Sequence, residues 1–203
     1  VCDEFGIGWT QRSVNDPDAW PWHPSAIVSI GYLRIINPHV LEMVNRRVIN
    51  CHYALLPNHR GRSAVPWAIV DGDQVTGITY HWVDEGIDTG RVLLQAVCSI
   101  EPTDTQATLF AKLHRLAIGH FPSALKLAQC DVPGMAQEGD GQYHRAGPPH
   151  GGEIDPMWEP ARIERFIRAM TYPPLPPATC GGTPIHTVDE FWRIRRGETG
   201  PTL

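Results

Sequence analysis

Short apolar runs rich in β-branched residues recur in the first half of the chain and predict four strands. They cover residues 26–32, 48–52, 75–83 and 92–97, and each is bounded by glycine, proline or polar residues. The first run ends at Gly31 and has the composition of a buried strand. The connection over residues 84–90 is short and Gly-rich, so we expect it to join the last two strands as in a hairpin.

Apolar residues spaced three and four apart predict four helices, over residues 38–44, 65–70, 104–129 and 160–170. Pro38 begins the first, Gly72 ends the second and Asp104 is the expected N-cap of the third. The proline-rich segment 173–177 ends the fourth helix, and the tail carries β-like pieces around Ile185 and Phe191.

The order of these elements predicts an α/β fold, because strands alternate with a helix before the long helix follows. The glycine- and proline-rich stretch 131–150 is the best boundary in the chain. We therefore expect a core over residues 1–130 and a small C-terminal subdomain over residues 131–203. A chain of 203 residues that is 42% hydrophobic can bury a core of this kind.

Composition narrows the possible partners. The net charge of −5 argues against a nucleic acid as the main partner, and no apolar run is long enough to span a membrane. Five widely spaced cysteines without a C-x-x-C pair predict reduced, mostly buried thiols in a cytoplasmic protein. Ten histidines without H-x-x-x-H or H-E-x-x-H spacing predict that no metal is bound.

Three polar residues near the second strand point to chemistry. Asn50 and His52 are two apart on a strand, so both side chains leave the same face. Asp88 follows in a Gly-rich turn. An amide donor, an imidazole and a carboxylate suit acyl transfer to an amine: the amide stabilises an oxyanion, the imidazole moves a proton and the carboxylate fixes the imidazole tautomer.

Each of these residues also has an ordinary structural interpretation. His52 can be a hydrogen-bonded residue at a strand end, and Asn50 a satisfied core amide. Asp88 before Thr-Gly is typical of a turn.

The surrounding motifs resemble the folate-dependent formyltransferase family. The resemblance rests on four segments: Asn50-Cys51-His52, the loop with Leu55-Leu56-Pro57 and Arg60-Gly61, Gly77-Ile78-Thr79, and Asp84 through Gly90. It implies a Rossmann-like core, N10-formyltetrahydrofolate as cosubstrate, and Asn50, His52 and Asp88 as catalytic residues. The first strand–helix unit of such a core is not visible, so we expect a core that is incomplete at its N-terminus.

The same resemblance implies a folate pocket formed largely by backbone groups. Its two segments are Tyr32, Leu33, Arg34, Ile35 and Ile36 at a strand end, and Val83, Asp84, Glu85 and Gly86 in the turn before Asp88.

The C-terminal segment is most similar to the nucleotide-sugar branch of the family, through the R-A-x-x-Y-P-P turn over residues 168–174. This implies as acceptor a 3-amino or 4-amino deoxysugar on a nucleoside diphosphate such as dTDP, used in lipopolysaccharide or other glycan biosynthesis. Arg168 and Tyr172 are candidate substrate contacts or a cap-and-packing pair. Arg60 either anchors its loop or meets a phosphate. A homodimer is expected from the resemblance.

Three alternatives stay open at this point. A methionyl-tRNA formyltransferase would need a basic module that the acidic chain does not show. A truncated, inactive folate or nucleotide-sugar binding module would not need the intact Asn50, His52 and Asp88. A formyl-folate hydrolase would use the same three residues and deliver the formyl group to water.

Overall fold

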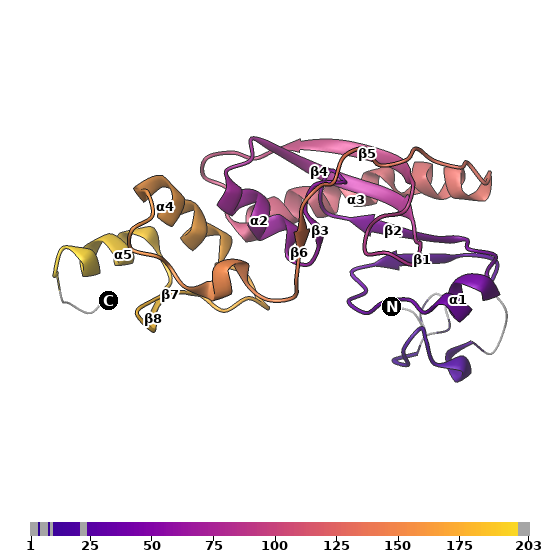
Figure 1. The fold of residues 1–203 in the computed structure, drawn as a ribbon, viewed down its shortest axis with the longest axis horizontal. Coiled ribbons are helices and arrows are strands. Elements are labelled where there is room, and N and C mark those ends of the chain that lie inside the picture. The colour runs from indigo at the N-terminus through magenta and orange to yellow at the C-terminus, as the bar shows by residue number, and fades with distance from the viewer. Residues whose placement is uncertain (1–3, 5–7, 9, 21–23, 199–203) are drawn as a thin grey trace.

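The computed structural model describes the chain except residues 1–3, 5–7, 9, 21–23 and 199–203. A four-stranded sheet lies at its centre (Figure 1), with strands in the order β1-β2-β4-β5. The strands are β1 (Ile27–Ile30), β2 (Val48–His52), β4 (Val75–Trp82) and β5 (Val92–Ser99). β1 is parallel to β2, and the other two pairs are antiparallel. The predicted α/β class and all four strands are confirmed.

The expectation that the first strand is buried is wrong. Val28 is 36% exposed and Ile30 is 52% exposed, while Ser29 between them is buried. Among the residues that the structure describes, β1 is the edge of the sheet and pairs only with β2. In the described part of the chain its apolar face is therefore only partly covered, although its composition is that of a core strand.

Helices cover the sheet and connect its strands. They include α1 (Pro38–Met43), α2 (Ala64–Asp71), which ends at Gly72 in the left-handed conformation, and the long α3 (Gln106–Gln129). The N-cap of α3 is Thr105 instead of Asp104, because the Thr105 hydroxyl accepts from the Thr108 amide. The Asp104 carboxylate binds Lys112 and the Thr108 hydroxyl instead.

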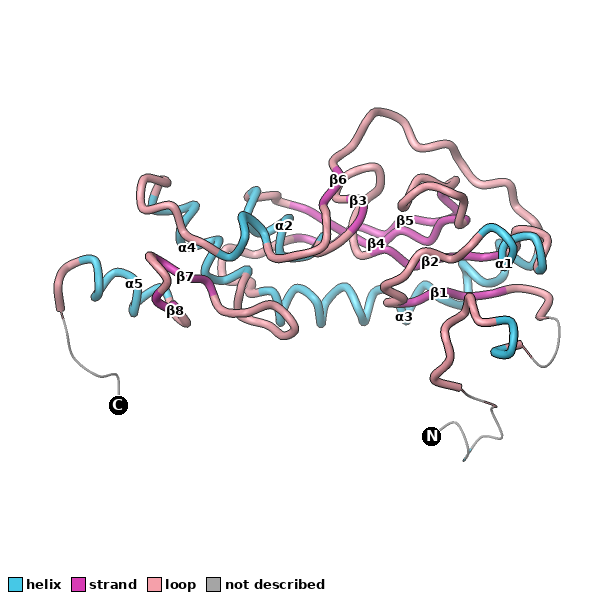
Figure 2. The backbone as a smooth tube through the Cα atoms, turned by 60° about the horizontal axis from the view of Figure 1, so that its bottom comes forward, coloured by secondary structure: helices cyan, strands magenta, loops and turns pink. Residues whose placement is uncertain are grey.

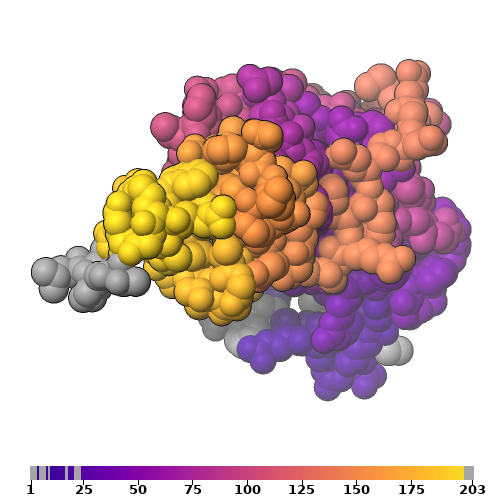
Figure 3. Space-filling view, turned by 60° about the vertical axis from the view of Figure 1, so that its left-hand side comes forward, coloured from indigo at the N-terminus to yellow at the C-terminus, as the bar shows by residue number. Residues whose placement is uncertain are grey.

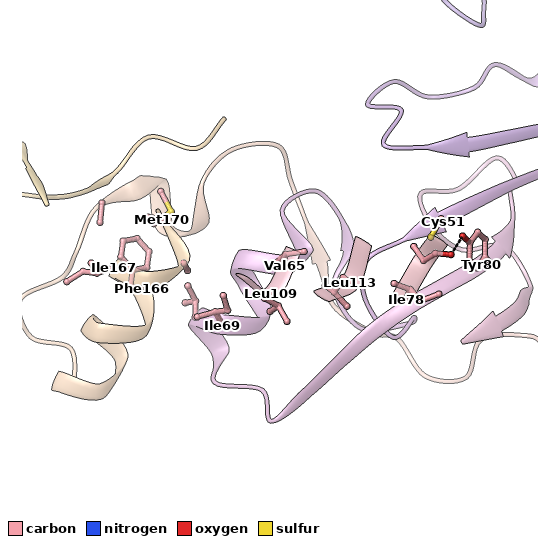
Figure 4. Packing of buried hydrophobic residues seen from close by; sticks show 14 of the residues in the cluster. Cys51, Val65, Ile69, Ile78, Tyr80, Leu109, Leu113, Phe166, Ile167 and Met170 are labelled. Carbon is pink, nitrogen blue, oxygen red and sulfur yellow. Dashed lines mark hydrogen bonds between the residues drawn. The ribbon is translucent and has the colours of Figure 1, made fainter. Parts of the chain in front are cut away.

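The larger of two hydrophobic clusters in the described residues runs from the sheet through α2 and α3 to α4 (Pro160–Ala169), as Figure 4 shows. The predicted stripe of α4 is confirmed, since Ile163, Phe166, Ile167 and Met170 are all buried. Residues before and after the stretch 131–150 thus share one core. The division into a core and a C-terminal subdomain stays a prediction.

The C-terminal segment forms one end of the molecule (Figure 3). β7 (Ala178–Cys180) pairs with β8 (Thr183–Ile185), as expected for a β-like piece near Ile185. The prediction of a second β-like piece, around Phe191, is wrong, because Phe191 lies in helix α5 (Val188–Arg195). The Thr187 hydroxyl caps this helix at the Glu190 amide, and acidic residues in its first turn and basic residues in its last suit its dipole.

The long connection between α3 and α4 passes over the sheet (Figure 2). Within it lie β6 (Tyr143–His144) and a 3-10 helix, η3 (Pro149–Gly152). β6 pairs in parallel with the short β3 (Arg60–Gly61) in the loop after β2. A further 3-10 turn, η2, spans Pro17–Ala19. The connection thus places residues near 137 and 144 against the loop that follows β2.

The described residues bear on two further points, the burial of the cysteines and the hydropathy of the helices. Of the described cysteines only Cys51 is buried, so the expectation of mostly buried thiols is wrong; Cys2 lies outside the described residues. Among the described helices, none combines the length and the hydropathy that a membrane span requires.

Candidate active site

The pairing of β2 with β4 arranges one polar face of the sheet. Asn50 lies opposite His81 and His52 opposite Thr79 in the antiparallel register. Opposite residues of antiparallel strands point to the same side, so these four side chains share a face. Ile49 and Cys51 point to the other side and join the hydrophobic core.

The turn after β4 brings Asp88 to this face. Asp88 has a positive φ of 53° in the segment between β4 and β5. Its Oδ2 lies 3.4 Å from Nδ1 of His52, and its Oδ1 lies 3.5 Å from Nδ2 of Asn50. The structure therefore brings together the three side chains that the sequence singled out; their catalytic role stays a prediction.

A backbone carbonyl, and not Asp88, fixes the tautomer of His52. The His52 Nε2 lies 2.8 Å from the carbonyl oxygen of His59. A carbonyl only accepts, so Nε2 carries the hydrogen and the lone pair of the neutral ring is on Nδ1, facing Asp88. A proton that arrives at Nδ1 completes a second hydrogen bond, to the carboxylate.

His81 is a member of the site that the sequence reasoning missed. Its Nδ1 lies 2.8 Å from the Trp82 carbonyl oxygen, so Nδ1 donates and Nε2 accepts. The Asn50 amide nitrogen donates to this Nε2 at 3.2 Å. The signal was the register of the two strands: once β2 and β4 pair, His81 lies directly opposite Asn50.

Burial and neighbouring charges set the ionisation of the site. Burial lowers the pKa of His52 below its ordinary value, and the charge of Asp88 only partly opposes this. Burial alone would raise the pKa of Asp88, but the nearby His52 and the hydrogen bond from the Gly61 amide hold it below its ordinary value. The resting site thus favours a neutral imidazole beside a carboxylate.

Hydrogen bonds from β3 and from the connection that leads into β6 hold Asp88 in place. The Gly61 amide donates to Oδ2 of Asp88 at 2.8 Å. The Gln137 side-chain amide donates to the carbonyl oxygens of Asp88 and Gly90, both at 2.8 Å. Gly61 has a φ of 88°, and a Cβ there would lie 2.3 Å from the His144 carbonyl oxygen. A glycine is therefore required where this loop meets β6.

The two segments expected to line a folate pocket lie side by side. Tyr32 and Val83 both pack against the small cluster that contains Ile36. Leu33 and Ile35 are 63% and 66% exposed, and Arg34 and Gly86 are also exposed. The side chains of Asp84 and Glu85 are bound within the protein, Asp84 to the Thr89 hydroxyl and Glu85 to Arg46. The amides of Val83 and Gly86 also bind within the protein, to the Val48 carbonyl oxygen and the Asp84 carboxylate, so the role of this segment in folate binding stays a prediction.

An open pocket of about 460 Å³ borders the second of these segments. Its lining includes Val83, Asp84 and Trp82, together with Arg46 and Arg47. Arg46 pairs with Glu42 and Glu85, so its charge is already balanced.

The three predicted substrate contacts are held by the protein. Arg60 donates to the Gln137 side chain and to the Asp140 carbonyl oxygen, which agrees with its interpretation as a loop anchor. Arg168 donates to the Asp104 carbonyl oxygen, and the Tyr172 ring stacks on Phe110 at 5.7 Å. No hydrogen bond or ion pair among the described residues links Arg168 or Tyr172 to Asn50, His52 or Asp88.

The chain is similar to two formyltransferases over about three quarters of its length. A GDP-perosamine N-formyltransferase of Brucella melitensis biotype 1 is 43% identical over 156 residues, which are 76% of this chain and 60% of the relative. A methionyl-tRNA formyltransferase of Verminephrobacter eiseniae is 37% identical over 162 residues, 78% of this chain and 49% of the relative. The chain thus spans about half to three fifths of the length of these relatives.

A solved structure shows the same arrangement of elements. The formyltransferase PseJ from Anoxybacillus kamchatkensis, in complex with UDP-4,6-dideoxy-4-formamido-L-AltNAc and tetrahydrofolate, is 27% identical. It aligns with a TM-score of 0.62 over 71% of this chain and 77% of that chain.

Residues 16–125 match the formyl transferase family, and this range is more than half of the chain. It contains β1 to β5, the three converging side chains and most of α3. The resemblance stated from the sequence motifs is confirmed, and the chain belongs to the formyl transferase family.

Proposed function

We propose that the protein is an N-formyltransferase that moves the formyl group of N10-formyltetrahydrofolate to the amine of a nucleotide-linked amino sugar. The observation that carries this proposal is the convergence of Asn50, His52 and Asp88 on one face of the β2–β4 pair. PseJ, a formyltransferase with a folate and a nucleotide-linked formamido sugar bound, supports the choice of donor and acceptor class.

We propose a role for each of the three residues on the basis of this geometry. Asn50 is half-buried, and its amide is a donor for the oxygen that becomes negative in the tetrahedral intermediate. His52 begins neutral, with its lone pair on Nδ1, and accepts the proton that the amine loses. The imidazolium is then held between the carboxylate of Asp88 and the carbonyl of His59, so its charge forms next to two acceptors. When the intermediate collapses, the bond between the formyl carbon and N10 breaks, and the imidazolium returns the proton to N10 of the departing tetrahydrofolate.

The proposal also specifies the nucleotide that carries the sugar. The sequence motifs led us to expect dTDP. The 43% identical relative is named for a GDP-linked sugar. We therefore propose a GDP-linked amino sugar as the first acceptor to test, with the dTDP-linked sugar as its competitor.

The proposal is tested by incubating the purified chain with N10-formyltetrahydrofolate and three acceptors: a GDP-linked 4-amino sugar, a dTDP-linked amino sugar and methionyl-tRNA. We expect the mass of one formyl group to be added to the GDP-linked sugar. Transfer to methionyl-tRNA alone would replace the sugar proposal with the tRNA one. Release of formate without a formylated acceptor would indicate a hydrolase, and no reaction by a folded chain would indicate a binding module.

A substitution at His52 tests whether this residue acts in the reaction without being needed for folding. His52→Asn should lower turnover at least ~100-fold with little change in substrate binding, because it removes the group that accepts the proton. His39→Asn, a change at an exposed histidine of α1, is the matched control and should leave turnover unchanged. Similar turnover in both variants would show that another group moves the proton.

A further inference from the structure

A second polar cluster lies beside the active site and is not used in the chemistry proposed above. It consists of His59 in the loop after β2, Asp71 at the end of α2 and His144 in β6. One ligand atom from each of the three lies within 4.8 Å of the others. The residues are far apart in sequence, so no spacing motif could reveal them.

The hydrogen bonds of His59 leave one of its nitrogens suited to bind a metal. Its Nε2 lies 2.8 Å from Oδ2 of Asp73, and a carboxylate only accepts, so Nε2 carries the hydrogen. The lone pair of His59 is therefore on Nδ1, which faces Nε2 of His144. A histidine that binds a metal through one nitrogen usually donates the other to a carboxylate or carbonyl in this way.

The separation of the two histidine nitrogens fits a shared ion. Nδ1 of His59 and Nε2 of His144 are 2.9 Å apart. Two nitrogens bound to one zinc ion at about 2.0–2.1 Å, with an angle near 90–109° between the bonds, lie about 2.9–3.4 Å apart. In the metal-free protein the same distance is bridged by one hydrogen.

The surroundings of the cluster are favourable for a cation. Asp71 supplies a carboxylate from the last residue of α2, where the helix dipole is negative. Asp73 adds a second negative charge next to His59. The ring of Trp67 stacks on His144 at 4.3 Å with an interplanar angle of 11°, which fixes the orientation of that imidazole.

We propose that His59, Asp71 and His144 form a binding site for a divalent transition-metal ion such as Zn²⁺, with Asp73 orienting His59. Two imidazoles and one carboxylate are a common ligand set for zinc, and a water completes the four positions. The His59 carbonyl also holds His52, so the ion would fix the backbone that positions the candidate catalytic histidine. The metal has no part in the formyl transfer itself.

The experiment is a titration of the chelator-treated, desalted chain with Co²⁺, followed by visible absorption, and with Zn²⁺, followed by calorimetry. We expect one ion per chain, a four-coordinate Co²⁺ spectrum without a thiolate band, and displacement of Co²⁺ by Zn²⁺. Absence of binding, or a thiolate band that points to cysteines, would overturn the proposal.

Variants locate the ion. His144→Gln and Asp71→Asn should each weaken Zn²⁺ binding at least ~10-fold, and Asp73→Asn should weaken it about 10–100-fold through His59. His39→Gln is the matched control and should bind as the wild type does. Asp71 is exposed, so its variant tests the site even if His144→Gln does not fold. Unchanged affinity in Asp71→Asn and Asp73→Asn would overturn the proposal, and because this readout does not use formyl transfer, its failure is distinct from failure of the proposed function.

Discussion

Thr79→Val should destabilise the protein through the loop that follows the candidate catalytic histidine. Thr79 is fully buried in β4. Its hydroxyl donates to the Ala54 carbonyl oxygen at 2.7 Å and accepts from the Leu56 amide at 3.1 Å. The Gln95 side-chain amide also donates to it, at 3.0 Å. One hydroxyl thus holds both ends of a buried turn.

The magnitude follows from these contacts. Valine has nearly the same shape as threonine but lacks the hydroxyl, so two buried backbone groups lose their partners. Each such loss costs about 1–3 kcal/mol, whereas the added methyl group contributes only about 0.8 kcal/mol. We expect the free energy of unfolding to fall by about 3 kcal/mol, a large part of the about 5–15 kcal/mol that a domain has.

The assay is urea unfolding followed by far-UV circular dichroism, with the midpoint and the slope fitted together. Thr76→Val is the matched control: Thr76 is also buried in β4, and its hydroxyl makes no hydrogen bond with the described residues. It should change stability by less than about 1 kcal/mol, because no hydrogen bond is lost and only one methyl group is added. Equal midpoints for the two variants would refute the reasoning that the hydroxyl network holds the turn.

Two other predictions concern backbone and pH. Gly61→Ala should lower the free energy of unfolding by more than about 1 kcal/mol, because φ of Gly61 is 88° and the added Cβ would meet the His144 carbonyl oxygen. Gly119→Ala lies in α3, where an added Cβ meets nothing within 4 Å. It should raise the free energy of unfolding by about 0.5–1 kcal/mol in the same urea assay. Equal effects at the two positions would contradict this. Stability should fall on acidification from about pH 7 to about pH 5, since burial lowers the pKa of His52, and lowers that of His144 to about 4, so that the unfolded chain binds more of these protons than the folded chain in that range. Urea midpoints across this range check the direction, His144→Gln should flatten the curve, and a rise in stability on acidification would contradict the sign.

The sequence predicted the elements best where periodicity and end signals agreed. β2 lies at residues 48–52 as expected, and Gly72 ends α2. Where tertiary structure decides, prediction failed: β1 has a core composition but lies at a sheet edge, and Phe191 lies in a helix whose cap outweighs the local β-like pattern. Burial depends on neighbours that composition does not contain.

The site was predictable to the extent that it depends on local geometry. Asn50 and His52 share a face because a strand alternates, and the Gly-rich turn could be expected to return Asp88 to them. His81 required the strand register, and the His59 carbonyl that fixes His52 required the path of a loop. The cluster of His59, Asp71 and His144 joins three segments, so only the fold brings it together.

The alternation of β4 links chemistry and folding in a single strand. Thr79 and His81 face the loop and the site, while Ile78 and Tyr80 face the core, where the Tyr80 hydroxyl donates to the Ala117 carbonyl oxygen of α3. A one-residue insertion or deletion before Ile78 that shifted the register of β4 against β2 would exchange these two sets of side chains. The connecting loops, by contrast, can change in length without turning Thr79 and His81 away from the side of the sheet that carries Asn50 and His52.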